Sequence, residues 1–356
     1  MTPASRVACL LAALQRRGAA EIFASSGAQG ALVFARLGQE AARPLAGGSF
    51  GCGEIPFLSR DWALFSPDLV ISVEGGAMTP IHDERGEALA LMEEAGRAEP
   101  RRRSCDRAVD YDLQPELSSP RFARTCEWVG ATSRRLTVAR RIPLPEVDPV
   151  ATFALFSPSG RERALFRSGS VRYVGCSPEL LAEGTREDFS CHKLSGTAPP
   201  GHDMSGDERL LREHESSVES VEAGLSRIGA VHREPRRICA LTTLQHFETT
   251  LRCRPGDGVG ILDCIEAVRP VGAHPRAEGL AFLSRLEEEP RGHYYGLSGF
   301  ILPGGRFSFS QLIRTLFCLD GAWYATVGAA VTAMSTPALE LEETRLKLSS
   351  IRFVPA

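Results

Sequence analysis

The sequence has no apolar run of the ~18 residues that a membrane-spanning helix requires, which excludes a helical membrane protein. It has no excess of positive charge either: 41 Lys and Arg stand against 44 Asp and Glu, and the net charge is −3. Nucleic acid is therefore not an expected partner. The N-terminal stretch VACLLAALQRRGAA has too short an apolar core and the wrong flanks for a signal peptide, and it predicts an amphipathic helix. We expect a cytoplasmic protein with neither membrane nor nucleic acid as partner.

Metal-binding patterns built from sulfur or histidine are also missing. The ten cysteines include no CxxC pair, and the eight histidines form no HExxH motif. The neighbours Cys191 and His192 are too few ligands for zinc. Because the chain shows no export signal, the cysteines are expected to be reduced thiols.

The 356 residues, 43% of them hydrophobic, are enough for one large domain with a sizeable core. Residues 94–120 are polar, charged and rich in proline, which predicts a connection between an N-terminal half (1–93) and a larger core (121–356). Strands come in runs with helices between them, so the predicted fold class is α+β. Helices are predicted at 87–98, 120–133, 148–156, 207–232 and 276–289. Strands are predicted at 30–38, 67–76, 134–142 and 236–247, as two strands within 162–184, and in a run over 294–331.

One short amphipathic segment near the C-terminus carries charges in a row. On a helix, Glu340, Glu343 and Lys347 would share one face, because they are spaced i, i+3 and i+7. On its own this pattern is typical of a solvated helix face with one Glu343–Lys347 ion pair. The rest of the chain decides whether such a row has another role.

Four segments, one of which includes this row, carry polar residues that a core does not need. They are CSPELLAEG (176–184), KLSGTAPPG (193–201), LLREHESSVESVEAGL (210–225) and the stretch 290–348. In this order and spacing they resemble the chorismate-binding enzyme family, which includes the isochorismate, salicylate, anthranilate and aminodeoxychorismate synthases. The resemblance covers roughly residues 120–351. It implies a single domain of two stacked antiparallel β-sheets flanked by helices, with the site between the sheets.

The resemblance also implies a Mg²⁺ site. Glu213 matches the metal-binding glutamate of the family's KExxEH helix, and Glu340 and Glu343 match the two acidic residues of its last helix. Mg²⁺ prefers hard oxygen ligands, so carboxylates and waters are the ligands expected. The charged row at the C-terminus would then be half of a metal shell.

Substrate-binding residues follow from the same resemblance. Chorismate carries one carboxylate on the ring and one on its enolpyruvyl ether. Arg314 and Tyr294 match the pair that grips the enolpyruvyl carboxylate, where a planar guanidinium suits bidentate binding. Lys347 matches a lysine that holds a substrate carboxylate. Gly196–Thr197 matches a turn in which glycine lets the backbone approach the ligand, and Gly328 matches a loop that supplies amide donors.

The predicted catalytic side departs from the family pattern. Glu179 matches the general acid that protonates the departing 4-hydroxyl, although Ser-Pro-Glu alone is also typical of a helix start. Arg135 stands where water-adding members have a lysine that activates water, and a guanidinium stays protonated and cannot act as a base. Arg269 occupies a histidine position in a shortened loop. Ser195 replaces the nucleophilic lysine of aminodeoxychorismate synthases, so that covalent route has no support.

These residues predict a Mg²⁺-dependent isomerase or lyase of the isochorismate or salicylate synthase type, acting in siderophore, quinone or specialised biosynthesis. One alternative is an aminating synthase, which needs no lysine base because ammonia is itself a nucleophile, and which would take ammonia from a separate glutaminase subunit. Another is a homologue that acts on a modified chorismate, with Arg135 and Arg269 contacting an extra anion. A third is a binding or regulatory protein that keeps the pocket without chemistry.

Overall fold

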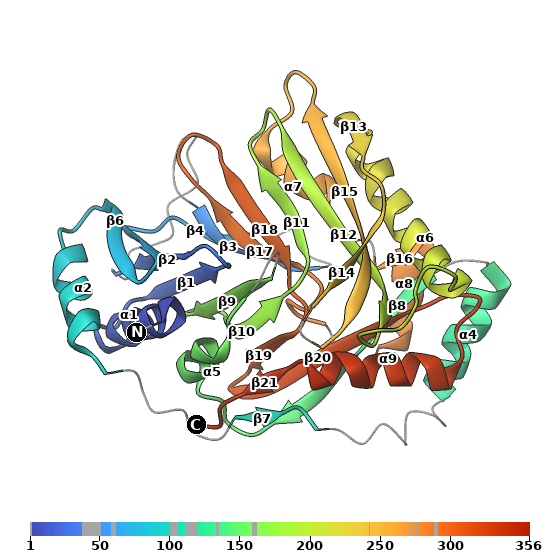
Figure 1. Cartoon of the computed structure of the whole chain (residues 1–356), viewed down its shortest axis with the longest axis horizontal. Coiled ribbons are helices and arrows are strands. Elements are labelled where there is room, and N and C mark those ends of the chain that lie inside the picture. Colours follow the sequence, from blue (N-terminus) through green and yellow to red (C-terminus); the bar gives the residue numbers. More distant parts are fainter. Residues whose placement is uncertain are drawn as a thin grey trace.

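Two antiparallel β-sheets packed against each other form the centre of the computed structural model (Figure 1). The structure describes residues 2–37, 51–57, 62–99, 106–110, 120–132, 135–158, 162–241, 243–270, 272–274, 276–287 and 291–356.

In the described part of the chain the first sheet has ten strands, in the order β16-β8-β20-β19-β10-β9-β1-β2-β5-β6. Their bounds in chain order are β1 Glu21–Ser26, β2 Ala31–Arg36, β5 Leu69–Glu74, β6 Ala77–Asp83, β8 Arg135–Leu144, β9 Arg163–Ser168, β10 Arg172–Ser177, β16 Ala273–His274, β19 Thr315–Leu319 and β20 Ala322–Val331.

The second sheet runs β13-β15-β12-β11-β18-β17-β3-β4, and β14 pairs with β15 off this path. Its strands are β3 Gly51–Ile55, β4 Ala63–Phe65, β11 Leu180–Gly184, β12 Phe189–Ala198, β13 Gly229–Arg233, β14 Arg237–Ala240, β15 Gln245–Pro255, β17 Leu297–Ile301 and β18 Phe307–Gln311. A short ladder joins β7 (Arg107–Ala108) to β21 (Arg352–Phe353).

Alternation along the strands explains how the sheets stack. In β1, Phe23 enters the core that also holds residues of the second sheet, whereas Ile22 and Ala24 enter the core under helix α1. This is the period-2 pattern of a strand buried on both faces. The predicted α+β class and the stacked antiparallel sheets are both confirmed.

Helices cover the outer faces of both sheets. The described helices are α1 Pro3–Arg16, α2 Ala88–Arg97, α4 Pro120–Thr132, α5 Pro149–Leu155, α6 Glu208–Leu225, α7 Ile261–Ala267, α8 Arg276–Leu286 and α9 Pro337–Ser349. Helix α6 packs on β12 and β15, and α9 packs along β20 (Figure 1). Each predicted helix is present, and the first begins as predicted near the N-terminus.

Three predicted elements differ in the structure. The helix expected over 207–232 ends at Leu225, because Gly229–Arg233 turns back to pair with β15. The single strand expected over 236–247 is two paired strands, β14 and β15, and the Leu241 amide donates to the Leu244 carbonyl between them at 2.8 Å. Residues 162–184 hold three strands rather than two. Ser177 ends β10, and Pro178 and Glu179 connect it to β11, so Ser-Pro-Glu is not a helix start.

The N-terminal half is built into both sheets. Strands β1, β2, β5 and β6 continue the first sheet beyond β9, and β3 and β4 continue the second beyond β17. The predicted connection 94–120 lies partly outside the described residues, and its described part includes the end of α2 and strand β7. The division at 1–93, 94–120 and 121–356 stays a prediction.

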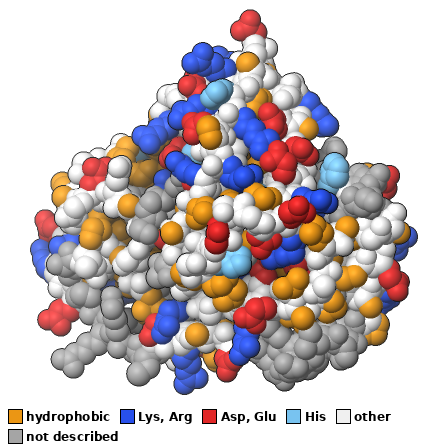
Figure 2. All heavy atoms as spheres, turned by 45° about the vertical axis from the view of Figure 1, so that its right-hand side comes forward, with side chains coloured by type: hydrophobic (Ala, Val, Ile, Leu, Met, Phe, Trp, Pro, Cys, Tyr) orange, Lys and Arg blue, Asp and Glu red, His pale blue; other side chains and the backbone are white. Residues whose placement is uncertain are grey.

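On the face shown in Figure 2, acidic and basic side chains are interspersed rather than gathered into a field of one sign. No described helix combines the length and the apolar character that crossing a bilayer requires.

Candidate active site

A cavity lies where β8 and β20 of the first sheet meet β12 and β15 of the second, between helices α6 and α9. It has about 740 Å³ of free space including its open mouth. The predicted site residues that line it are Arg135, Glu179, Thr197, Glu213, Tyr294, Arg314, Gly328 and Lys347. Gly196, Glu340 and Glu343 lie just behind this lining, and Arg269 lies elsewhere.

Helix α9 turns its charged face inward. Glu340 is 1% exposed and Glu343 is 5% exposed, whereas Leu339 is 46% exposed. The helix begins at Pro337 with Thr336 as its N-cap, whose hydroxyl accepts from the Leu339 amide at 3.4 Å. The interpretation of this row as a solvated face is therefore wrong.

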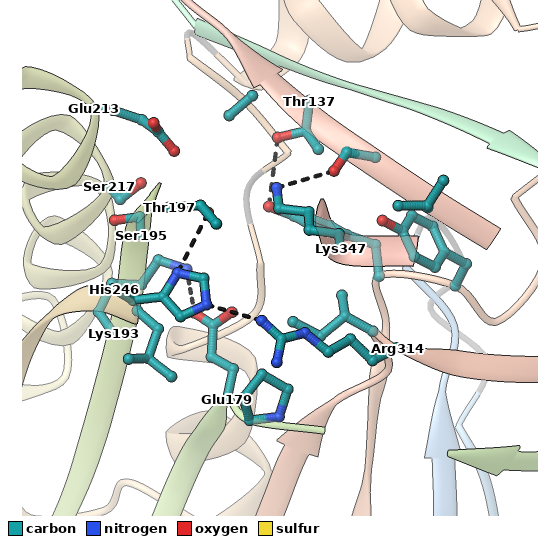
Figure 3. Close-up of a pocket in the computed structure, with 18 of the residues that line it drawn as sticks. Thr137, Glu179, Lys193, Ser195, Thr197, Glu213, Ser217, His246, Arg314 and Lys347 are labelled. Atoms are coloured by element: carbon teal, nitrogen blue, oxygen red, sulfur yellow. Dashed lines mark hydrogen bonds and ion pairs between the residues drawn. The ribbon is translucent and has the colours of Figure 1, made fainter. Parts of the chain in front are cut away.

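Helix α6 presents its own polar row to the same region. Arg209, Glu213 and Ser217 are spaced i, i+4 and i+8 and so lie one above another. Glu213 and Ser217 line the cavity, and Figure 3 shows both side chains coming from this helix. The guanidinium of Arg209 lies 3.8 Å from Glu343 Oε2 and 4.0 Å from Glu340 Oε1, so it bridges α6 to α9.

The buried carboxylates of the two helices hold protons unusually well. Burial, together with the neighbouring Glu343, raises the pKa of Glu213 to about 7. Burial and Glu343 likewise raise the pKa of Glu340 to about 8. Both shifts arise because anions lose hydration and repel one another in the interior.

The residue types in this cluster fit Mg²⁺. Glu340 Oε2 is buried with no hydrogen-bond partner, and Glu343 is held by Lys347 at 2.6 Å. Within the described ranges, no three His, Cys, Asp or Glu side chains form a ready-made metal cage. The cluster supplies hard oxygen donors and excess negative charge, which a divalent cation would neutralise, while Arg209 and Lys347 now balance part of that charge.

A hydrogen-bonded row of Arg314, His246 and Thr197 lies across the cavity (Figure 3). Arg314 Nη2 donates to His246 Nε2 at 2.8 Å, so the imidazole is neutral and its proton is on Nδ1, 3.3 Å from Thr197 Oγ1. Burial and the Arg314 cation hold the pKa of His246 well below its ordinary value. Arg314 has a φ of +52°, which aims its side chain from the turn before β19.

Two glycines act differently from the prediction. Gly328 lies within strand β20, opposite Ala139, and not in a loop of amide donors. Its carbonyl accepts from Lys347 Nζ at 3.1 Å, and a Cβ there would lie 3.0 Å from the Tyr294 hydroxyl. Gly196 has a φ of +67° at a bulge in β12, and its amide donates to Glu213 Oε1 at 3.4 Å. The glycine conformation thus brings the backbone to a carboxylate of the metal cluster.

Glu179 is not a lone buried acid. It is 4% exposed and its Oε1 accepts a hydrogen bond from Lys193 Nζ, and the lysine is itself 7% exposed. Burial alone would lower the pKa of Lys193, but the Glu179 carboxylate outweighs that effect and raises it. The transferable proton of the pair therefore belongs to Lys193.

The two replacement arginines have different surroundings. Arg135 lines the cavity, its Nη1 donates to Ser217 Oγ, and its buried Nε has no hydrogen-bond partner. Arg269 instead binds the Glu266 carboxylate at 3.1 Å and the Pro56 carbonyl at 2.6 Å. The prediction that Arg269 meets the substrate finds no support in this position, because the side chain fastens the chain near α7 to the end of β3.

Several residues that line the cavity were not predicted from the sequence. Lys193, His246 and Tyr295 line the cavity but belong to no expected set. Ser195 Oγ lies 3.0 Å from His214 Nδ1, and burial followed by the Lys193 cation lowers the pKa of His214 to about 4. The one available signal was Lys193 itself, a charge in the strand KLSGT at the position where the family pattern PIxGT has proline.

Comparison with known proteins adds sequence relatives to this geometry. Residues 132–352 match a family described as chorismate binding enzyme. The chain is 30% identical over 227 residues to the salicylate biosynthesis isochorismate synthase of Pseudomonas aeruginosa, covering 59% of this chain and 48% of that protein. It is 29% identical over 259 residues to anthranilate synthase component 1 of Streptomyces coelicolor, covering 65% and 50%. The chain thus spans about half the length of these curated relatives.

The fold also occurs in solved structures. The menaquinone-specific isochorismate synthase of Escherichia coli superposes with a TM-score of 0.70, covering 93% of this chain and 87% of that chain. At 17% identity this similarity concerns the fold alone.

Proposed function

Because this chain belongs to the chorismate-binding enzyme family, we propose that it is a Mg²⁺-dependent enzyme that converts chorismate, or a closely related dicarboxylate, to an isochorismate- or salicylate-type product. The observation that carries the proposal is that one cavity combines two cations with a cluster of carboxylates. Arg314 supplies one positive charge, and Lys347 supplies the second beside the carboxylate cluster of α6 and α9, where it pairs with Glu343.

The two cations, Arg314 and Lys347, suit the two carboxylates of chorismate. Arg314 already donates to His246, and its remaining N–H groups, together with the Tyr294 hydroxyl, would hold the enolpyruvyl carboxylate. Lys347 is paired with Glu343 and would add a contact to the ring carboxylate. Several fixed contacts on one small ligand favour a single orientation, which is a large part of catalysis for a substitution on a ring.

Glu213, Glu340 and Glu343 would hold Mg²⁺. Bound there, the ion would neutralise the ring carboxylate and help to align the ring. Within the chain itself, the raised pKa values of Glu213 and Glu340 reflect their burial first and then the negative charge concentrated at this point.

Glu179 would pass a proton to the departing 4-hydroxyl. The proton is drawn from Lys193, which donates to the Glu179 carboxylate in the buried pair. The coupled pair supplies the proton with which the departing hydroxyl leaves as water.

Aminating chemistry is the second candidate. Arg135, at the position of the expected water-activating lysine, cannot act as a base, and ammonia does not require one. Such an enzyme would receive ammonia from a separate glutaminase.

The test is turnover of chorismate with Mg²⁺ by the parent protein and by the Glu179→Gln and Glu343→Ala variants. We expect Glu179→Gln to lower kcat by roughly 10²–10⁴-fold, the usual contribution of a general acid. Glu342→Gln is the matched control, because Glu342 is exposed on the same helix as Glu343. Turnover by both variants at the parent rate, with melting temperatures unchanged, would contradict the proposal.

A further inference from the structure

The water-adding reaction needs a proton acceptor that Arg135 cannot be. A guanidinium has no free lone pair at working pH. Lys193 is in the same cavity, but its ammonium is bound to Glu179 and is held protonated there. The proton acceptor must therefore be another group that lines the cavity.

Tyr295 has the right position for that group. Its side chain lines the cavity beside Arg135 and Lys193, and its hydroxyl lies 3.4 Å from Thr137 Oγ1. None of its contacts requires the phenolic oxygen to remain protonated, because Thr137 can donate to it.

The backbone of Tyr295 has a strained conformation that places its side chain at the cavity. Its φ is +69°, a left-handed conformation that is rare and unfavourable for a bulky side chain. The residue is fixed there by its amide, which donates to the Leu312 carbonyl at 2.9 Å. The ring packs edge-on against Phe57 with centroids 5.2 Å apart. Such strain is typical of residues placed for function rather than for stability.

Charged groups from several elements face the ring. Lys193 of β12 and Arg135 of β8 both favour the phenolate, and Glu179 opposes it. The Arg291 guanidinium lies 5.9 Å from the ring centre, and the Tyr294 ring lies 5.8 Å away. Burial alone would raise the pKa of Tyr295, but the two cations outweigh burial and lower it.

We propose that Tyr295 is the general base of this enzyme: it accepts the proton of the attacking water, with Lys193 and Arg135 as the flanking cations that stabilise its phenolate. The inference rests on the proposed conversion of chorismate. It replaces the lysine base expected at position 135 by a tyrosine on a different element.

The proton balance closes within the site. Water forms a C–O bond to the ring at C2 and gives its proton to the Tyr295 oxygen. The ring double bond shifts, the C4–O bond breaks, and the departing hydroxyl leaves as water with a proton that Lys193 passes to it through the Glu179 carboxylate. The Tyr295 hydroxyl then returns its proton to Lys193. One water enters, one leaves, and no oxidant or other co-reactant is needed.

The first experiment measures the ionisation of the Tyr295 phenol directly and needs no substrate. Tyrosinate absorbance is titrated in the parent and in Tyr295→Phe, and the difference isolates this residue. We expect a midpoint below the ordinary value of about 10. The double variant Lys193→Met/Glu179→Gln removes both charges of the buried pair, and it should raise the midpoint by withdrawing a flanking cation. A midpoint at or above 10 in the parent overturns the proposal.

The second experiment reads catalysis. In the parent, kcat/KM for the water-derived product should rise with pH as Tyr295 ionises, and Tyr295→Phe should lose this limb and fall by roughly 10²-fold or more. Tyr324→Phe is the control, because Tyr324 lies on β20 outside the cavity lining. An unchanged pH profile in Tyr295→Phe overturns the proposal. If the parent makes no product from chorismate, the proposed function fails, and the absorbance titration alone decides whether Tyr295 ionises as we infer.

Discussion

Gly328 is a single residue of β20 that lies against both Lys347 and Tyr294. Its carbonyl accepts from Lys347, and its missing side chain leaves room for the Tyr294 hydroxyl. A Cβ would lie 2.7 Å from the Val138 carbonyl of the neighbouring strand, which cannot move without breaking the sheet. The residue therefore sets how closely Lys347 and Tyr294 approach each other.

We predict that Gly328→Ala displaces Tyr294 and raises KM for chorismate by about tenfold or more, which corresponds to roughly 1.4 kcal/mol of lost binding. Steady-state kinetics measures the change. Gly130→Ala is the control, because a Cβ at this position of α4 meets no atom within 4 Å. Equal KM values in the two variants would contradict the role given to Gly328.

Residues carried by a motif were placed well from sequence, and residues outside motifs were not. Glu213 and Arg314 sit in recognisable segments and line the cavity as expected. Arg269 was placed from a loop of altered length, and it binds Glu266 instead. Tyr295 could not be chosen over Tyr294, because the inward aim of its ring depends on a left-handed φ that composition does not reveal.

Helix α9 shows why a charge pattern alone does not predict which face of a helix is buried. Amphipathic spacing says which residues share a face, but not which face meets the protein. Here Glu340 and Glu343 are buried and Leu339 is exposed, because part of the inward face of the helix borders the cavity, while Leu348 of the same helix enters the core. Helix α6 could be located from its apolar stripe, but its end could not, because β13 forms by pairing with a strand that follows it.

The N-cap of α9 supports a second prediction. Thr336→Ala removes the hydroxyl that accepts from Leu339, and it should lower the free energy of unfolding by about 1 kcal/mol. Urea denaturation measures this loss. Thr336→Ser keeps a capping hydroxyl and should retain most of the stability. If both variants unfold alike, the cap does not stabilise the helix as proposed.

Pairing between strands that are distant in the sequence determines the architecture of the whole molecule. It is also the feature that sequence patterns predict least well. β1 pairs with β9 and β3 with β17, so strands far apart in the chain are neighbours in the sheets. Periodicity identifies strands but does not state their partners. The stacked architecture was expected only because the motifs resemble a known family.

Stability of the whole chain should depend on pH through its buried carboxylates. Glu213 and Glu340 have pKa values of about 7 and about 8 when folded, against about 4.3 for glutamate in an unfolded chain. Above about pH 6.5 the histidines are mostly neutral in both states, so the folded chain then binds more protons than the unfolded chain. We predict that the free energy of unfolding falls between about pH 6.5 and pH 8.5, by an amount on the order of a few kcal/mol.

We predict that Mg²⁺ reverses this loss by binding the ionised carboxylates of the folded state. Thermal unfolding measured with and without the ion should show greater stabilisation at about pH 8 than at about pH 6. Glu340→Gln should reduce both the pH dependence and the effect of Mg²⁺. Stability that rises with pH in this range, or that ignores the ion, would contradict the metal site.

The most direct test of the proposed function is the product formed from chorismate and Mg²⁺ in ¹⁸O-labelled water, with and without ammonium, identified by mass spectrometry. We predict isochorismate or salicylate carrying one ¹⁸O atom in the ring hydroxyl, since that oxygen comes from the attacking water. An unlabelled amino product formed only with ammonium would establish the aminating alternative instead. No product under either condition would contradict the proposed conversion of chorismate itself.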